Sequence, residues 1–265
     1  MPGSKPALWQ FRISPYSEKA RWTLDHKGVE YERKAPPPGL HMLIALTLTR
    51  GGHKTFPVLQ LDGKSIGDST AIIAALEERF PEPPLYPEDP EERRRALELE
   101  DWFDEELGPH IRLLVFHEAT QEPELMAEAV VPDLPRPLRR FRGAAVAAGR
   151  YASTFAGWRY GVKSAEAADV ARGRVMAALD HLEAELDGNE YLVGDHFSVA
   201  DLTAAALFYP LVFPPEGPPL PDPPDGFKNF LALLEGRDGC RWVERMFREH
   251  RKPVRASDAP LATPV

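Results

Sequence analysis

Two serines stand where the sequence predicts the first helix to begin. Ser14, Pro15, Tyr16 and Ser17 follow an alternating apolar segment and precede a helical pattern that runs to Lys27. Ser before Pro is a favourable helix start, because the hydroxyl caps free backbone N–H groups and proline fits the first turn. The same N–H groups, the helix dipole and a hydroxyl also stabilise an anion. Ser14 is therefore either an ordinary N-cap or a donor to a bound anion, with Ser17 as the alternative donor.

A second group of candidate binding residues surrounds a strand pair. Asp68 and Ser69 stand at another predicted helix start. Capping alone explains them, but backbone N–H groups with a serine hydroxyl also suit a ligand carboxylate. Pro57 begins a predicted strand, where an edge position that needs no N–H is the simplest interpretation. The pattern leaves both a structural and a ligand-binding role open.

The elements that must position these residues follow the order β-α-β-α-β-β-α. Residue periodicity and turn residues predict strands over 7–13 and 29–34, helices over 17–27 and 40–49, a strand pair over 56–66 and a helix ending at Phe80. Prolines between 81 and 90 end this segment and predict a domain boundary. Amphipathic helices are expected beyond it over 93–114 with a kink at Pro109, and around 175–186, 198–209 and 230–247, with irregular chain over 210–224. The sequence thus predicts an α/β domain over 1–82 and an all-helical domain over 91–265.

Composition excludes several classes of function. The chain has 265 residues and 29.6 kDa, with 32 basic and 41 acidic residues and a net charge of −9. An acidic chain is a poor binder of nucleic acid or of an anionic membrane surface. The single cysteine, Cys240, excludes an intrachain disulfide and disfavours a cysteine-based metal site. No apolar run has the length of a membrane span and no signal peptide is recognisable. We expect a reduced, cytoplasmic protein.

Two further patterns are interpreted structurally. Glu106, His110 and His117 share one helical face, but they lack a fourth ligand, and no metal site is expected. The acid-rich segment 77–106 is interleaved with arginines and is interpreted as a solvated surface.

Three motifs in fixed order carry a family resemblance. They are Ser14-Pro15-Tyr16-Ser17, then Thr55-Phe56-Pro57-Val58-Leu59 with Ile66-Gly67-Asp68-Ser69-Thr70-Ala71-Ile72, and finally Phe197-Ser198-Val199-Ala200-Asp201-Leu202. Together they resemble the cytosolic glutathione transferase superfamily. The resemblance implies a thioredoxin-like first domain, an all-helical second domain and glutathione as co-substrate. Ser198 and Asp201 then form a capping box that serves folding.

The resemblance also implies roles for individual residues. Ser14 would donate to the glutathione thiolate. A cis Phe56–Pro57 bond would turn Val58 toward the peptide, and Asp68 with Ser69 would hold the γ-glutamyl carboxylate, although the family commonly has Glu before Ser. Lys54 and Thr55 would contact the glycyl end of glutathione. The second substrate would be contacted by four other residues, namely Tyr16, Trp102, Phe103 and His110.

The energetics suit a serine. A free thiol has a pKa of about 8.5, and lowering it by about two units requires roughly 2.7 kcal/mol. One hydrogen bond to a charged sulfur supplies on the order of 1.5 to 3 kcal/mol. Relatives that exchange disulfides carry Cys in this motif, whereas this chain has Ser at both places. Transfer of the thiol to a small electrophile is therefore predicted in preference to thiol–disulfide exchange by an enzyme cysteine.

The sequence leaves alternative functions open. One is a non-catalytic thiol-binding or interaction module, and another is a peroxide or disulfide reductase that uses glutathione without an enzyme thiol. The thiol itself could be a relative of glutathione. The family resemblance further implies a homodimer, in which Leu97 and Phe103 are the expected exposed apolar contacts.

Overall fold

Four short strands form one mixed sheet in the order β2-β1-β3-β4. The computed structural model describes residues 5–36, 39–121 and 164–252, together with a few helical positions between 143 and 157. The strands are β1 (Ala7–Trp9), β2 (Glu32–Lys34), β3 (Val58–Leu61) and β4 (Lys64–Gly67). β1 pairs parallel with β2 and antiparallel with β3. The predicted hairpin turn between β3 and β4 is present: Asp62 and Gly63 have φ of +48° and +80°, the left-handed values that a two-residue turn of this kind requires.

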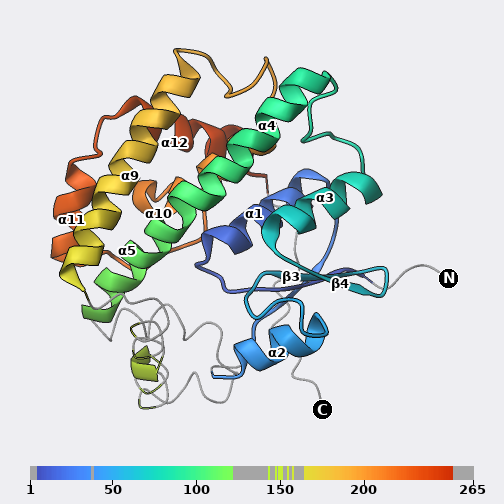
Figure 1. Ribbon diagram of the computed structural model, residues 1–265, viewed down its shortest axis with the longest axis horizontal. Helices are drawn as coiled ribbons and strands as arrows, with labels where there is room; N and C mark the ends of the chain where they lie inside the picture. The colour runs from blue at the N-terminus through green and yellow to red at the C-terminus, as the bar shows by residue number, and fades with distance from the viewer. Residues whose placement is uncertain are drawn as a thin grey trace.

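Helices cover both faces of the sheet. On one face lie α1 (Pro15–His26) and α3 (Ser69–Arg79), and on the other lies α2 (His41–Leu48) (Figure 1). Leu8 and Leu59 of the sheet pack against Leu24 of α1 and Ile72 of α3, and all four are fully buried. The β-α-β-α-β-β-α order and the thioredoxin-like fold are therefore confirmed.

The first strand is shorter than the sequence indicates. The prediction of a strand over 7–13 is wrong beyond Trp9, because the chain turns at Arg12 and Ile13. The Ser14 N–H donates to the Phe11 carbonyl at 3.2 Å and closes this turn. Gln10 is buried and Phe11 is half-buried, as residues of a strand can be. The alternation of apolar and polar residues alone therefore could not distinguish this turn from a strand.

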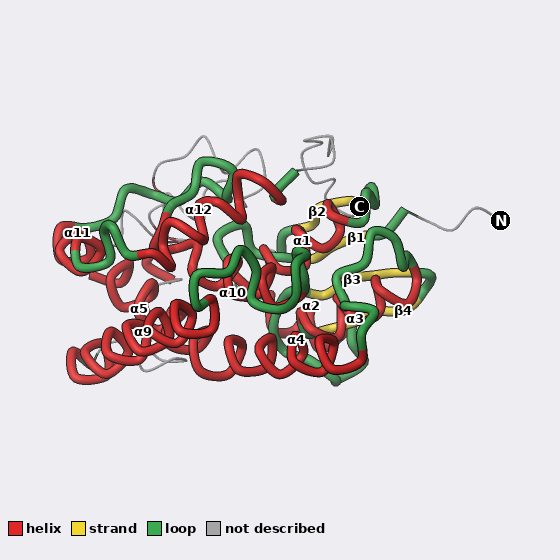
Figure 2. The backbone as a smooth tube through the Cα atoms, turned by 90° about the horizontal axis from the view of Figure 1, so that it is seen from above, coloured by secondary structure: helices red, strands yellow, loops and turns green. Residues whose placement is uncertain are grey.

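The rest of the described chain is helical. Its elements are α4 (Pro90–Trp102), a π-helical turn η1 (Phe103–Leu107), α5 (Gly108–Gln121), α9 (Ala165–Leu186), α10 (Val199–Val212), α11 (Asp225–Ala232) and α12 (Asp238–His250). Figure 2 shows the sheet at one end of the molecule and α5, α9, α11 and α12 toward the other, while α4 reaches back to α3. α10 runs through the middle of them and is buried along nearly its whole length. An all-helical second part is confirmed for the described residues.

Two details differ from the sequence prediction. The long helix is interrupted by a π-helical turn at Phe103–Leu107, just before Pro109, which the sequence did not indicate. Pro210 lies inside α10, so the irregular connection begins only after Val212. The segment between α3 and α4 coincides with the proline cluster, and the division at residues 82 and 91 stays a prediction.

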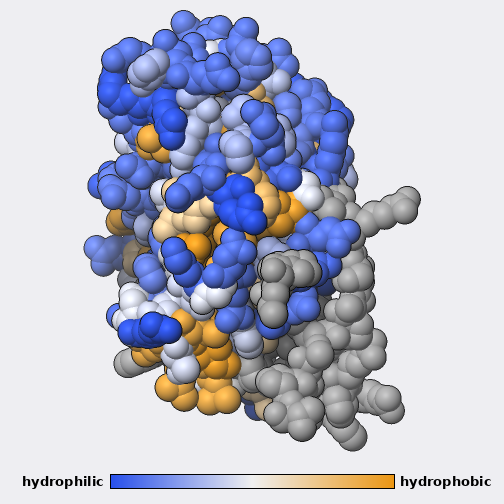
Figure 3. All heavy atoms as spheres, turned by 90° about the vertical axis from the view of Figure 1, so that its right-hand side faces the viewer, coloured by the Kyte–Doolittle hydropathy of each residue, from blue (hydrophilic) through white to orange (hydrophobic). Residues whose placement is uncertain are grey.

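One face of the molecule carries an apolar patch. Figure 3 shows it at the lower edge, at the height of α2 in Figure 1. α2 exposes Leu43 and Leu46, and Leu40 just before it is exposed as well.

Among the described residues, no helix is both long enough and apolar enough to cross a membrane.

Candidate functional site

The ends of three strands meet at one edge of the sheet. Trp9, the last residue of β1, is paired with Val58 at the start of β3, and Val58 is paired with Gly67 at the end of β4. The segments that continue from these ends carry Ser14 and Asp68. The register alone therefore brings the three predicted binding segments to one place.

Ser14 is the N-cap of α1. Its Oγ accepts a hydrogen bond from the Ser17 N–H at 3.3 Å, and its backbone is extended, as a cap requires. The side chain is half-buried. Within the described part of the chain its O–H donates to no protein acceptor, so the proton remains available for an anion in front of the helix. Capping and donation to a ligand are compatible.

Ser17 is placed differently. It is fully buried, and its Oγ has no hydrogen-bond partner among the described residues. A hydroxyl closed off from solvent is poorly placed to meet a ligand. The two serines of the motif are therefore distinguished by exposure, which the sequence did not reveal.

Asp68 caps α3 from an unusual backbone conformation. Its φ is +76° and its ψ is 135°, a region that residues with a Cβ rarely adopt, and its side chain accepts from Thr70 N at 3.0 Å and Ala71 N at 3.2 Å. Ser69 is buried beside it. Such strain is stored preferentially at functional sites. An ordinary N-cap does not require it.

The residues around Pro57 complete this edge. The Phe56–Pro57 bond is cis, and Phe56 is buried against Trp9 and Phe11. Lys54 and Thr55 precede it on an exposed loop.

The His53 ring also packs on this edge. A Cβ added to Gly67 would lie 2.6 Å from the ring, so any larger residue at this position would have to displace the ring.

Tyr16 joins the helix start to the helical part of the molecule. Its hydroxyl donates to the Asp104 carbonyl at 3.2 Å, and the Arg112 guanidinium lies 5.8 Å from its ring centroid. Burial raises the pKa of Tyr16 above its usual range, with the Asp104 and Asp68 carboxylates adding to it against the effect of Arg112. Tyr16 is thus a neutral anchor whose hydroxyl is already engaged.

The remaining candidates for the second substrate are not equivalent. Phe103 has no exposed surface and packs against Phe208 in the core, so it neither lines an opening nor offers a dimer contact; both expectations for it are wrong. Trp102 is half-buried, with its ring 3.9 Å from that of His181. His110 is half-buried too, and burial, then Arg174, lower its pKa.

A buried charged cluster beneath the two helix starts was not predicted. Lys19 Nζ lies 2.5 Å from Asp104 Oδ2 and 3.3 Å from Glu100 Oε1, and Thr70 Oγ1 is 2.9 Å from each of those carboxylate oxygens. Lys19 and Glu100 are fully buried. The interpretation of the segment 77–106 as a solvated surface is therefore wrong at Glu100. The i,i+4 spacing of Glu100 and Asp104 was the available signal.

The His, Cys, Asp and Glu side chains of the described ranges were compared with the requirements of a metal site and of a reactive thiol. Those ranges contain no group of three or more His, Cys, Asp or Glu side chains placed to hold a metal ion. Burial raises the pKa of Cys240 to about 11, which leaves it as a neutral thiol on α12.

Family models match both parts of the chain. "Glutathione S-transferase, N-terminal domain" matches residues 8–84, and "Glutathione S-transferase, C-terminal domain" matches residues 143–236. The chain belongs to the glutathione S-transferase family. The Ser14 and Asp68 helix starts and the cis Pro57 all lie within the first match.

Curated relatives of this glutathione S-transferase match over part of their length. A maleylacetoacetate isomerase of Rattus norvegicus is 29% identical over 138 residues, which cover 47% of this chain and 59% of the relative. A probable glutathione S-transferase of Solanum tuberosum is 34% identical over 96 residues, covering 34% and 41%. The chain spans about half the length of the curated relatives it matches.

Solved structures agree over nearly the whole chain. A Tau class glutathione S-transferase from Mangifera indica superposes with a TM-score of 0.60 at 19% identity, covering 98% of this chain and 94% of that one. A maleylacetoacetate isomerase from Anaeromyxobacter dehalogenans, with GSH bound in its active site, gives 0.55 at 21% identity, covering 97% and 98%. At these identities the likeness concerns the fold.

Proposed function

We propose that this glutathione S-transferase binds glutathione, or a closely related thiol, and activates its sulfur with the Ser14 hydroxyl for attack on a small electrophile. Ser14 supplies the observation that carries the proposal: it caps α1 through its oxygen and keeps its proton free. A thiolate in front of α1 then meets that proton and the positive end of the helix dipole. Ser14 donates without ionising, because stabilising the sulfur requires no base.

The rest of the peptide would lie along the strand edge. Asp68 and Ser69 lie at the N-terminus of α3. Because the Asp68 carboxylate already accepts from the Thr70 and Ala71 N–H groups, the Ser69 N–H would meet the ligand carboxylate, and the strained Asp68 backbone supports a ligand role at this helix start. Val58 would meet the peptide backbone next to Phe56 and Pro57. Lys54 and Thr55 are exposed on the loop before them, where they would meet the glycyl end.

Isomerisation is a second candidate for the same site, favoured by the likeness to maleylacetoacetate isomerases. A thiolate that adds to a carbonyl-conjugated double bond forms an S–C bond and moves the π electrons onto the carbonyl oxygen. Rotation about the new single bond followed by expulsion of the thiolate restores the double bond. Glutathione is then returned unchanged, whereas transfer consumes one glutathione for each product. Measuring glutathione consumption per turnover separates the two.

The Ser14→Ala variant tests the assignment. If about 2.7 kcal/mol of sulfur stabilisation is lost, turnover of an aryl halide with glutathione falls on the order of 10²-fold while glutathione still binds. The loss of an N-cap also destabilises by about 1 kcal/mol. Ser164 is a matched control, because it caps α9 with its Oγ 3.2 Å from Ala167 N.

The outcomes separate chemistry from folding. Ser164→Ala is expected to lower the melting temperature about as much as Ser14→Ala and to leave turnover unchanged. Full turnover in Ser14→Ala would reject Ser14 as the activating residue. Ser17→Ala then becomes the next variant, although its buried hydroxyl predicts an effect on stability alone.

The rival functions make different predictions. A thermal-shift series with glutathione and other small thiols identifies the thiol, since a ligand at about 100 times its Kd stabilises by roughly 2.7 kcal/mol. Glutathione binding without turnover of a broad panel of electrophiles would favour a non-catalytic module. Faster consumption of a hydroperoxide than of an aryl halide would favour a glutathione-dependent reductase.

A homodimer is also proposed, as is usual in the resembling family. α3 and α4 are the elements expected to meet the second copy, and Leu97 remains the half-buried apolar candidate on α4. Light scattering that gives the mass of one 29.6 kDa chain at every concentration would contradict this.

A further inference from the structure

The turn that delivers Ser14 is held by a buried arginine. Arg21 Nη2 donates to the Arg12 carbonyl at 2.8 Å, and Arg21 Nη1 lies 3.4 Å from the Phe11 carbonyl. Nη1 also donates to Gln10 Oε1 at 2.5 Å. One guanidinium therefore fixes the backbone and a side chain of the segment directly before the cap residue.

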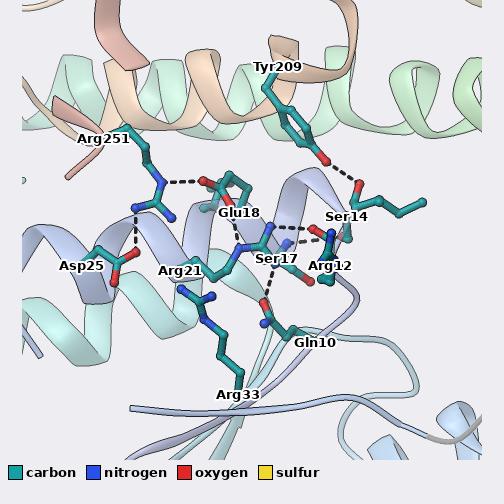
Figure 4. A network of polar contacts seen from close by, with 12 residues as sticks. Gln10, Arg12, Ser14, Ser17, Glu18, Arg21, Asp25, Arg33, Tyr209 and Arg251 are labelled. Atoms are coloured by element: carbon teal, nitrogen blue, oxygen red, sulfur yellow. Dashed lines mark hydrogen bonds and ion pairs between the residues drawn. The ribbon is translucent and has the colours of Figure 1, made fainter. Parts of the chain in front are cut away.

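The next carbonyl along the chain is held from the helical half. The Tyr209 hydroxyl on α10 donates to the Ile13 carbonyl at 2.6 Å. Tyr209 has no exposed surface, so water cannot substitute for this donor. Figure 4 shows Tyr209 reaching from α10 to the start of α1. The peptide bond that it holds is the one between Ile13 and Ser14.

Arg21 is itself oriented by a chain of buried ion pairs. Glu18 Oε2 accepts from Arg21 Nε at 2.6 Å, and Glu18 Oε1 accepts from Arg251 Nε at 2.6 Å. Arg251 Nη1 also donates to Asp25 Oδ2 at 2.6 Å (Figure 4). Burial alone would raise the pKa of Glu18, but the two arginines outweigh burial and hold the pKa below its usual range. Two arginines thus balance two carboxylates.

We propose that Tyr209 is a positioning residue for Ser14, and that Arg251 acts on the same turn through Glu18 and Arg21. Because a sulfur–hydroxyl hydrogen bond depends on distance and angle, a small shift of the turn weakens the activation of the thiol without removing any group that touches it. The helical half of the molecule thereby sets the position of the activating hydroxyl. The kinetic part of this proposal rests on the proposed function.

Tyr209→Phe is the primary test, since it removes one hydroxyl and keeps the buried ring. Tyr31→Phe is the matched control: Tyr31 is buried to 4% exposure, and its hydroxyl accepts from Arg33 instead of binding the turn. Both variants lose one buried hydroxyl contact. Only Tyr209→Phe releases the peptide bond before Ser14.

Hydrogen exchange measures how firmly the turn is held, and it needs no substrate. The Ser17 N–H donates to Ser14 Oγ and the Ser14 N–H donates to the Phe11 carbonyl. Both amides are expected to exchange about fivefold faster in Tyr209→Phe, the factor that corresponds to one ordinary hydrogen bond. Unchanged exchange, or the same acceleration in Tyr31→Phe, would overturn the positioning role of Tyr209.

Steady-state kinetics measure how the position of the turn affects activation of the thiol. In Tyr209→Phe we expect kcat to fall about fivefold at neutral pH, KM for glutathione to stay the same, and the ascending limb of the pH–rate profile to move to higher pH. A merely structural role would lower Tm and leave that profile in place, and this result would overturn the kinetic part.

Arg251 is tested by comparing Arg251→Lys with Arg251→Met at a temperature where both are folded. Lysine keeps the charge beside Glu18 and is expected to retain more of the wild-type pH profile than methionine. Equal profiles in both variants and the wild type would remove Arg251 from the positioning network.

The two proposals fail separately. If Ser14→Ala keeps full turnover, the proposed function is wrong, while the exchange rates still decide whether Tyr209 positions the turn. If Ser14→Ala loses turnover and Tyr209→Phe does not, the proposed function stands and the positioning role is rejected.

Discussion

Replacing Lys19 by methionine would leave two carboxylates facing each other inside the molecule. Lys19 and Glu100 are fully buried, and the Asp104 side chain is 17% exposed. In the native protein the ammonium lies within ion-pair distance of both carboxylates. Methionine has a similar length and apolar character, so the substitution removes the charge while keeping most of the packing.

The expected loss of stability is large for a single substitution. Removing one partner of a buried ion pair costs about 3–5 kcal/mol, because the remaining charge is left without compensation. With about 2–4 °C of melting temperature per kcal/mol for a chain of this size, Tm is expected to fall by roughly 6–20 °C. The exposed pair of Lys5 and Glu30, 3.2 Å apart, provides the control: Lys5→Met is expected to lose less than about 1 kcal/mol.

The pH dependence identifies the cause. Burial raises the pKa of Glu100, with Lys19 acting in the opposite direction. A carboxyl whose pKa is higher in the folded state favours folding while it is protonated, and that contribution is lost as pH rises through the folded pKa. Without Lys19 this pKa rises further. The difference in Tm between wild type and Lys19→Met should therefore be small in acid and grow toward neutral pH.

The assay is thermal unfolding of wild type, Lys19→Met and Lys19→Met/Glu100→Gln between acid and neutral pH. The double variant removes one of the two opposed charges and is expected to recover a large part of the loss at neutral pH. A Tm for Lys19→Met within about 2 °C of wild type at neutral pH, with no pH dependence, would refute the description of this cluster as a buried ion network.

The remaining predictions concern packing, protonation and capping. Gly108→Ala would place a Cβ 2.0 Å from Tyr16 Oη and is expected to lower the free energy of unfolding by about 1–3 kcal/mol. Gly173 on α9 has open space around it, so Gly173→Ala is expected to raise the free energy of unfolding by up to about 1 kcal/mol, and denaturant unfolding measures both variants. Burial, together with Lys27 and His250, lowers the pKa of His26 to about 4. Because the unfolded chain binds this proton more readily, the free energy of unfolding should fall by up to about 3 kcal/mol as the pH drops from 6.5 to 4, and it should fall less in His26→Gln. Asp201→Ala leaves two backbone donors 2.8 Å away unpaired and is expected to lose about 3 kcal/mol or more, with Asp201→Asn losing less.

The strand–helix order was predictable because local patterns encode it. Asp62–Gly63 fixes the hairpin, and Gly28 with φ +63° ends the α1 segment where a left-handed residue is required. The Ser14 cap and the Asp68 cap were equally visible, since capping depends on neighbours within three residues. Turns and helix caps could therefore be predicted from the sequence, because they depend only on neighbouring residues.

The burial of charge could not be predicted in the same way. Glu18, Lys19 and Arg21 follow one another in a pattern that is typical of a solvated helix, yet all three are buried. Arg21 pairs with Glu18 one turn away, but the other partners of Lys19 and Glu18 lie far along the chain, at Glu100 and at Arg251, and no local pattern connects them. Only the tertiary structure, which brings Glu100 of α4 and Arg251 at the end of α12 beside α1, reveals that these charges are paired.

That packing connects the segment around Ser14 to both halves of the molecule. α1 lies between the sheet and the helices, and its buried charged residues pair in two directions: Lys19 pairs with Asp104 of the π-helical turn, and Glu18 pairs with both Arg21 and Arg251. Tyr16 is held at the Asp104 carbonyl, and Ile13 is held by Tyr209. Ser14 lies between these two anchored residues. A thioredoxin-like domain alone would present the same serine and the same cap, but on a turn with neither anchor, so we infer that the helical half gives the Ser14 hydroxyl the fixed position that stabilising a sulfur anion requires.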